Sequence, residues 1–208
     1  IENEITQPTE LRDFFEWHQG VKNYGFWAIE IQDQDCLATI KDCQRHIADK
    51  VHPDYSRQPH ITLVAAGLLS NNFFSQELLM QQVDKIKQLN FSKFPLYISS
   101  ANSFTTCPYL SILDPENNLS ILRDTLNSVS PEEGYGDYTP HITLGFYNNH
   151  YKISDILTLI SKANSTNKKL IVTDIIFAEY KTKEIQGPYK VTHRIPLNET
   201  DYDIPDSV

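Results

Sequence analysis

The stretch "PHITL" stands at residues 59–63 and again at residues 140–144, and this repeat decides the fold that we expect. A polar loop leads into each copy, at residues 52–59 and 131–140, and each copy contains β-branched residues that favour strands. The repetition of one strand sequence predicts two similar lobes, each of which contributes one copy to a shared site.

The two-residue period of a strand divides each copy between two faces. One face carries two histidines and two threonines: His60, Thr62, His141 and Thr143. The other face is apolar and consists of Ile61, Leu63, Ile142 and Leu144. We expect the apolar face to be buried in each lobe, so that the histidines and threonines point into a cleft between the lobes.

Two imidazoles and two hydroxyls that converge on one point suit phosphodiester chemistry. A neutral imidazole takes a proton from an attacking water, an imidazolium gives one to the leaving oxygen, and histidine does both near neutral pH. Hydroxyls donate hydrogen bonds to the non-bridging phosphate oxygens, which carry charge in the transition state. This set requires no metal and no cofactor, and we expect neither.

Two other interpretations of the repeat stay open. A single His-x-Thr in a strand is usually a hydrogen-bonded structural pair, although the repetition of the whole motif argues against this. A zinc site is the second alternative, because His60 and His141 are both possible ligands. A catalytic zinc needs about three protein ligands, and no third ligand stands out in the sequence.

Hydrophobic periodicity predicts the elements around the motif strands. Helices are expected over residues 10–17, 36–47, 75–89, 119–129 and 153–163. Strands are expected over residues 25–31, 60–69, 95–104, 109–114, 141–147, 170–180 and 189–197. We therefore expect an α+β fold with two antiparallel sheets and outer helices. It forms one domain over residues 1–208, with a core at about 24–197 and a loose acidic tail at 198–208.

The composition favours a packed globular protein, with 40% hydrophobic and 22% charged residues. A formal net charge of −9 argues against binding to long duplex nucleic acid, but permits a local cationic pocket for a small phosphate. No apolar run is long enough for a membrane span. The 3 cysteines form no evident disulfide framework. We therefore expect a cytoplasmic monomer that does not associate with membranes.

The paired motif resembles the signature of the 2H phosphoesterase superfamily, here "HITL" at residues 60–63 and 141–144. The order of elements is similar too, with an opening strand "GFWAIEI" at 25–31 and a closing "GPYKVTHRIPL" at 187–197. The resemblance covers about residues 24–197. That superfamily includes 2′-5′ RNA ligase-like proteins, cyclic nucleotide phosphodiesterases and enzymes that degrade 2′-5′ or cyclic oligonucleotide signals.

The resemblance implies a bilobal fold and a role for each motif residue. His60 and His141 become the acid–base pair, and Thr62 and Thr143 bind the phosphate. In relatives that open 2′,3′-cyclic phosphates the second histidine is the base, which makes His141 the base and His60 the acid. We expect a metal-independent phosphodiesterase that acts on 2′-linked or cyclic phosphates in small nucleotide or short RNA substrates. RNA end processing, 2′-5′ RNA ligation and a non-catalytic nucleotide-binding module are the alternatives.

Five further residues are candidates for substrate binding. Tyr24 and Trp27 lie in the opening strand, where an aromatic ring either stacks on a nucleobase or packs in the core. Tyr138 and Tyr147 flank the second motif, and Tyr147 has the parity of the motif histidine and threonine. Arg57 precedes the first motif, where it either pairs with phosphate or is solvated.

Overall fold

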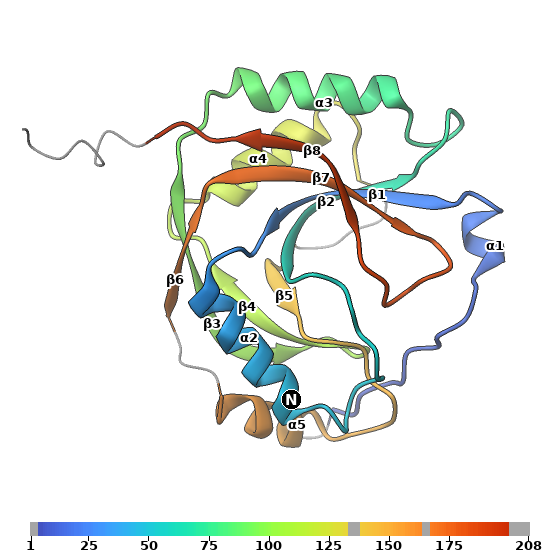
Figure 1. The fold of residues 1–208 in the computed structure, drawn as a ribbon, viewed down its shortest axis with the longest axis vertical. Helices are drawn as coiled ribbons and strands as arrows, with labels where there is room; N and C mark the ends of the chain where they lie inside the picture. The colour runs from blue at the N-terminus through green and yellow to red at the C-terminus, as the bar shows by residue number, and fades with distance from the viewer. Residues whose placement is uncertain (1–3, 133–137, 164–166, 200–208) are drawn as a thin grey trace, which may run out of the picture.

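Two four-stranded antiparallel sheets form the fold (Figure 1), and the structure, a computed structural model, describes residues 4–132, 138–163 and 167–199. The first sheet has the strand order β2-β1-β7-β8 and the second β5-β4-β3-β6. The strands of the first sheet are β1 (Asn23–Glu30), β2 (His60–Leu68), β7 (Asp174–Lys181) and β8 (Lys190–Pro196). Those of the second are β3 (Phe94–Ser103), β4 (Pro108–Leu113), β5 (His141–Thr143) and β6 (Lys168–Val172).

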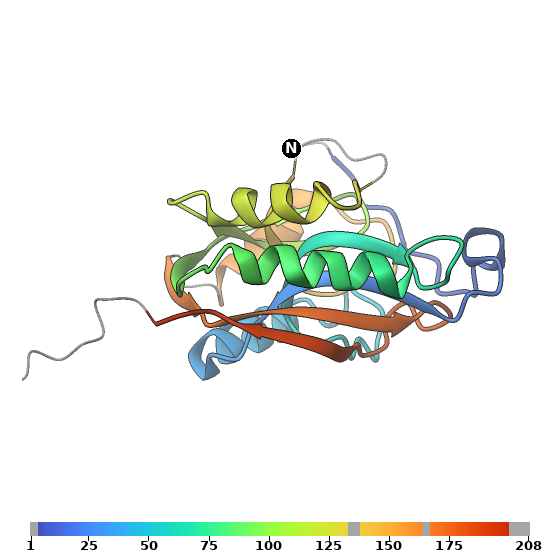
Figure 2. The ribbon, with the colours of Figure 1, turned by 90° about the horizontal axis from the view of Figure 1, so that it is seen from above.

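Helices cover the two sheets from outside. Helices α3 (Gln76–Gln88) and α4 (Asn118–Asn127) lie side by side and contact the first sheet through β8 and β2 (Figure 2). Helices α2 (Gln34–His46) and α5 (Ile153–Ser161) contact each other, and α5 packs on β3 of the second sheet. Among the described residues, none of the helices has the length and hydropathy that a bilayer-spanning helix requires.

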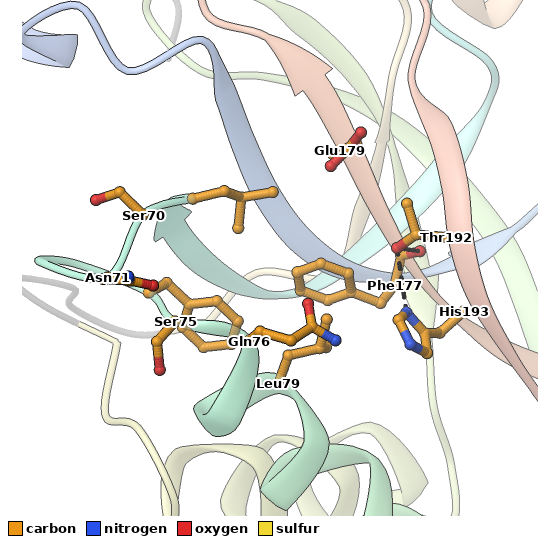
Figure 3. A pocket seen from close by; sticks show the side chains of 11 residues that line it. Ser70, Asn71, Ser75, Gln76, Leu79, Phe177, Glu179, Thr192 and His193 are labelled. Atoms are coloured by element: carbon orange, nitrogen blue, oxygen red, sulfur yellow. Dashed lines mark hydrogen bonds between the residues drawn. The ribbon is translucent and has the colours of Figure 1, made fainter.

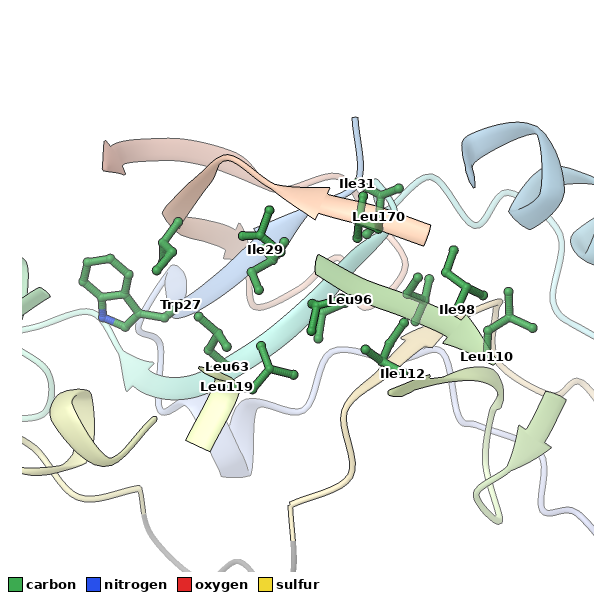
Figure 4. Close-up of a cluster of buried hydrophobic side chains, with 14 of the residues drawn as sticks. Trp27, Ile29, Ile31, Leu63, Leu96, Ile98, Leu110, Ile112, Leu119 and Leu170 are labelled. Carbon is green, nitrogen blue, oxygen red and sulfur yellow. The ribbon is translucent and has the colours of Figure 1, made fainter. Parts of the chain in front are cut away.

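A continuous apolar core joins the sheets and the helices (Figure 4). It includes the apolar face of both motif strands: Ile61, Leu63, Ile142 and Leu144 are each at most 1% exposed. This outcome confirms the predicted burial of that face. Trp27 lies at one end of the core, where its indole N–H donates a 2.7 Å hydrogen bond to the Gln82 side chain.

The opposite face of the first sheet carries a second, smaller apolar cluster. Its buried members are Phe26, Ala28, Ile176, Ala178 and Tyr189. Because neighbouring residues of a strand point to opposite faces, Phe26 belongs to this cluster while Trp27 belongs to the main core. Two members of this cluster, Phe26 and Tyr189, contact the ring of His60 in the first motif.

Three predicted elements differ from the structure. The expected helix at 10–17 is only α1 (Phe15–His18), because Leu11 and Phe15 are exposed and no apolar face packs on the fold. The expected strand at 170–180 is two strands, β6 and β7, which belong to different sheets. Only Thr173 and Asp174 interrupt the apolar run there, and this break was too short to signal the change of sheet. The second motif strand ends at Thr143 instead of continuing to residue 147.

The first and the last strand of the described chain belong to the same sheet. The first sheet takes β1 and β2 from the first part of the chain and β7 and β8 from the last, whereas the second sheet uses the strands between them. The lobes are therefore not consecutive halves of the sequence. Residues 200–208 of the predicted tail lie outside the described residues, while Asn198 still bonds the Phe91 carbonyl at 2.9 Å.

Candidate active site

The two motif strands are the edge strands of their sheets and contact each other. Strand β2 is at the edge of the first sheet and begins at His60. Strand β5 is at the edge of the second sheet and begins at His141. The contact between β2 and β5 brings the two copies of the motif together from positions far apart in the chain.

Both imidazoles are fixed by the same local contact. The Nδ1 atom of His60 lies 2.8 Å from the carbonyl oxygen of Gln58, two residues earlier. The Nδ1 atom of His141 lies 2.7 Å from the carbonyl oxygen of Thr139, again two residues earlier. A carbonyl oxygen only accepts, so each Nδ1 carries the proton and each neutral ring has its lone pair on Nε2. Each ring can therefore exchange a proton through Nε2.

Each imidazole also contacts two aromatic rings. Phe26 and Tyr189 have ring centroids 5.2 and 5.3 Å from that of His60. Phe104 and Tyr109 have ring centroids 5.0 and 5.2 Å from that of His141. The two half-sites thus share an anchor, an aromatic surround and a place at the start of an edge strand.

Burial favours the neutral form of both imidazoles. The pKa of His60 is lowered to about 4, mainly by burial and to a smaller extent by the positive charges of Arg57 and His141, against the raising effects of the Gln58 carbonyl and of Glu30. Burial also lowers the pKa of His141, while its bond to Thr139 raises it. A positive charge on His141 disfavours a second positive charge on His60, which links the two half-sites electrostatically.

The motif threonines lie on the same face as their histidines, and both are partly exposed. Thr62 is opposite Ala28 of β1, a small neighbour, and Thr143 is opposite Tyr109 of β4. The thiol of Cys107 interacts with the Thr143 hydroxyl, and burial raises the pKa of this thiol to about 11. Cys107 is therefore a neutral neighbour of the second half-site and not a thiolate.

A cavity of about 350 Å³ lies against the first half-site, and we name it the first-motif cavity. Its lining consists of Trp17, Tyr24, Phe26, Arg57, His60, Thr62, Ala65 and Tyr180. The ring centroids of Trp17 and Tyr24 are 5.4 Å apart, and those of Tyr24 and Tyr180 are 5.4 Å apart. A row of aromatic rings therefore leads along the cavity that contains His60 and Thr62.

Arg57 is held against the wall of this cavity. Its guanidinium donates to the carbonyls of Ile185 at 2.8 Å and Gly187 at 3.1 Å. The same group lies over the Tyr180 ring, 4.0 Å from its centroid. These contacts place a permanent positive charge beside His60, and they hold the guanidinium against protein groups, so that it is not the freely solvated side chain of one of the two predicted roles.

Two of the predicted substrate-binding residues are wrong. Trp27 and Tyr147 are both 0% exposed, so neither presents a surface to a ligand. The parity argument for Tyr147 fails because β5 ends at Thr143, and Gly145, with a φ of +154°, interrupts the regular alternation before Tyr147. The Tyr147 hydroxyl lies 2.7 Å from the Ser103 hydroxyl inside the fold.

The remaining predicted residues have different positions. Tyr24 and Arg57 line the first-motif cavity with His60 and Thr62. Tyr138 instead donates its hydroxyl proton to the Thr62 carbonyl at 2.8 Å, so that this hydroxyl is engaged by protein.

In the opening strand, the parity of Phe26 with Tyr24 places both on one face of β1, opposite to Trp27. Five other aromatic residues of the site were missed by the sequence analysis: Trp17, Phe104, Tyr109, Tyr180 and Tyr189. These five reach the site through contacts between segments that are distant in sequence. No local pattern identifies them.

A second cavity, of about 310 Å³, lies on the side of the first sheet that faces α3 (Figure 3). Phe74, Phe177, Glu179 and His193 belong to its lining, and His193 Nδ1 lies 3.2 Å from the Thr192 hydroxyl. Neither motif contributes to it. Among the described residues no group of three or more His, Cys, Asp or Glu side chains could hold a metal ion.

The family model of the 2′-5′ RNA ligase superfamily matches residues 31–184, a span that contains both motifs. The chain belongs to the 2′-5′ RNA ligase superfamily. This finding confirms the resemblance to 2H phosphoesterases predicted from the paired motif. No curated protein sequence matches the chain. Trp17 and Tyr24 of the first-motif cavity lie before the matched span.

Three solved structures align with this chain and have the same fold. LigT of E. coli aligns with a TM-score of 0.57 at 15% identity, over 86% of this chain and 99% of LigT. TT0787 of Thermus thermophilus aligns with a TM-score of 0.57 at 12% identity, over 85% and 98%. Usb1 of Kluyveromyces marxianus aligns with a TM-score of 0.54 at 13% identity, over 85% and 99%. LigT has also been crystallised with 3′-AMP, ATP and NADP+.

Proposed function

We propose that the chain is a metal-independent phosphodiesterase that hydrolyses 2′-linked or cyclic phosphodiesters in small RNA-derived substrates. One observation carries the proposal: His60 and His141 begin two contacting edge strands and have the same Nδ1 anchor. Each Nε2 is therefore available for proton transfer, as an acid–base pair requires. Membership of the superfamily supports the reaction class.

The reaction needs one neutral and one protonated imidazole. The neutral ring takes a proton from water as the water oxygen forms a bond to phosphorus, and the protonated ring gives its proton to the leaving oxygen as the P–O bond breaks. The hydroxyls of Thr62 and Thr143 donate to the non-bridging oxygens, where charge accumulates. A proton passes from one histidine to the other, by way of solvent, to restore the starting state.

The resemblance implies that His141 is the base and His60 the acid. For a 2′,3′-cyclic phosphate this order gives attack opposite the 3′ oxygen, protonation of that oxygen by His60, and a 2′-phosphate product. Because the pKa of His60 is lowered to about 4, its imidazole is mostly neutral near pH 7 in the free protein. The negative charge of a bound phosphate raises this pKa and so increases the protonated fraction that the acid role requires. Phosphorus NMR decides the order: a 3′-phosphate product from the same pose reverses the two roles.

We propose that the first-motif cavity binds the nucleoside next to the scissile phosphate. Tyr24 supplies an aromatic ring for the base, and Arg57 supplies a positive charge near the phosphate. The complex of LigT with 3′-AMP supports a substrate of nucleotide size. A net charge of −9 is in keeping with a small substrate and with no long duplex as a partner.

The same site supports two alternatives. Two-histidine chemistry also serves RNA end processing and, in the reverse direction, 2′-5′ ligation. A nucleotide-binding module without turnover would use the same cavity.

A monomer is supported by the origin of both half-sites in one chain, and a cytoplasmic location by three buried cysteines that form no disulfide.

Turnover after exhaustive chelation tests the proposal. The panel consists of 2′,3′-cyclic mononucleotides, 2′-5′ oligoadenylates, cyclic oligonucleotides, and RNA that carries a 2′,3′-cyclic phosphate end or a 2′-5′ linkage. We expect hydrolysis of at least one substrate at an unchanged rate without divalent metal. Binding without turnover identifies a binding module, joined ends identify a ligase, and turnover restored only by zinc or magnesium contradicts metal independence.

A further inference from the structure

We propose that Tyr138 is a positioning residue that sets the placement of the two half-sites relative to each other, and that Arg123 and Glu132 hold it in place. The proposal rests on the proposed function, because it assigns these residues to the same reaction. Its basis is the outer edge of β2, the strand that carries His60 and Thr62.

As an edge strand, β2 has a row of backbone groups without a partner strand on one side. Side chains from elsewhere in the chain bind the backbone of this strand at three positions between Thr62 and Ala65. The Tyr138 hydroxyl donates to the Thr62 carbonyl at 2.8 Å, and the Arg123 guanidinium donates to the Leu63 carbonyl. The amide of Ala65 donates to the Glu132 carboxylate at 2.8 Å.

The three side chains also bind one another. The Arg123 guanidinium lies 3.1 Å from the Glu132 carboxylate and 3.8 Å from the centroid of the Tyr138 ring. The side chains of Arg123 and Glu132 are only 15% and 10% exposed, so water screens their ion pair weakly. The backbone amide of Glu132 donates to the Asn127 side chain at 3.0 Å, which ties the cluster to the end of α4.

Tyr138 connects the half-sites by a short route. Its hydroxyl is bonded to Thr62 of the first motif. Its backbone continues directly into Thr139, whose carbonyl anchors the imidazole of His141 at 2.7 Å. One residue therefore spans from the phosphate-binding threonine of one half-site to the anchor of the other histidine. A displacement of about 1 Å at such a position can cost about 100-fold in rate.

The contacts of Tyr138 fit positioning better than substrate binding. Its hydroxyl is already bonded, one face of its ring is covered by Arg123, and it does not belong to the lining of the first-motif cavity. Burial raises the pKa of Tyr138, so its hydroxyl stays protonated and continues to donate.

Tyr138→Phe removes the bond to Thr62 and keeps the ring on Arg123. We expect kcat to fall about 10- to 100-fold, with KM within about threefold of the wild type and the melting temperature little changed. Tyr151→Phe is the matched control, because its hydroxyl bonds the Asn148 side chain at 2.6 Å, off both motif strands. We expect this control to retain wild-type kcat.

Arg123 is tested by a conservative and a disruptive change. Arg123→Lys keeps the charge and loses the planar fork, so it should reduce kcat partly, whereas Arg123→Met should reduce it as far as Tyr138→Phe does. The double variant Arg123→Met with Tyr138→Phe should be no slower than the slower single variant, since both changes release the same contact. If the losses of kcat in the two single variants add up in the double variant, the shared role is contradicted.

Histidine ring NMR gives a readout that does not depend on turnover. Tyr138→Phe should shift the ring signals of both His60 and His141, and Tyr151→Phe should shift neither. Unchanged kcat together with unchanged ring signals overturns the positioning role. If instead His60→Ala keeps full activity, the proposed function fails, and the ring signals still decide whether Tyr138 joins the two half-sites.

Discussion

Pro59 and Pro140 occupy equivalent places in the two sheets: the carbonyl of Pro59 accepts from the Ile31 amide at 3.0 Å, and that of Pro140 from the Ile112 amide at 3.1 Å. Proline has no N–H to donate, which suits the first step into an edge strand. In each sheet the next residue is the motif histidine. The repeated sequence therefore produces a repeated backbone geometry, and this places the two imidazoles alike.

The motif threonines should act on the transition state. Thr62→Val and Thr143→Val keep the shape and remove the hydroxyl, and we expect each to lower kcat on the order of 100-fold while raising KM much less. Serine at either position should restore most of the rate, because it keeps the donor. A loss confined to the melting temperature would make these threonines structural.

The rate should depend on pH in a defined direction. The pKa of His60 is lowered to about 4 and that of His141 is also lowered, so both lie below the usual 6.5 in the free protein. The combination of one protonated and one neutral imidazole is then most populated below pH 6.5. We expect a bell-shaped kcat/KM profile with its maximum below pH 6.5.

Bound phosphate should move the profile of kcat. Its negative charge raises the pKa of both histidines, so the maximum of kcat should lie at higher pH than the maximum of kcat/KM. The limbs of either curve describe the coupled pair and not one residue. A kcat/KM maximum at pH 7.5 or above, or a flat profile with chemistry limiting, contradicts the acid–base account.

Arg57 should contribute to binding more than to chemistry. Arg57→Met removes the positive charge of the first-motif cavity, and we expect KM to rise about 10- to 100-fold with a smaller change in kcat. The change also removes one cause of the lowered pKa of His60, so the kcat/KM maximum should shift to higher pH. Arg45→Met removes the same charge from an exposed site and is the control. An unchanged KM would make Arg57 an anchor of the 184–187 turn alone.

The spacing of apolar residues predicted which side chains of the motif strands are buried and where four of the helices lie. The alternation in the two motif strands predicted the burial of Ile61 and Ile142, and helical periodicity predicted α2, α3, α4 and α5. It failed where a short polar break marks the end of one strand and the start of another. The run that contains β6 and β7 is interrupted only at Thr173 and Asp174, although its two parts join different sheets.

Site residues outside the motifs were harder to predict because long-range pairing places them. Tyr180 reaches the first-motif cavity because β7 pairs with β1, and Tyr189 reaches His60 across the same sheet. The role inferred for Tyr138 depends on a backbone carbonyl of β2, which no side-chain pattern reveals. Trp27 was misplaced for a local reason, since the parity of the strand already puts it on the core side.

The central claim is that His60 and His141 act together on one phosphate. The most direct test is the single-turnover rate of His60→Ala and His141→Ala on the best substrate of the panel, with His193→Ala as a control outside the motifs. Each motif variant should be folded and slower by about 100- to 10,000-fold, while the control keeps the wild-type rate. A motif variant that is folded and retains a near-wild-type rate would contradict the two-histidine mechanism.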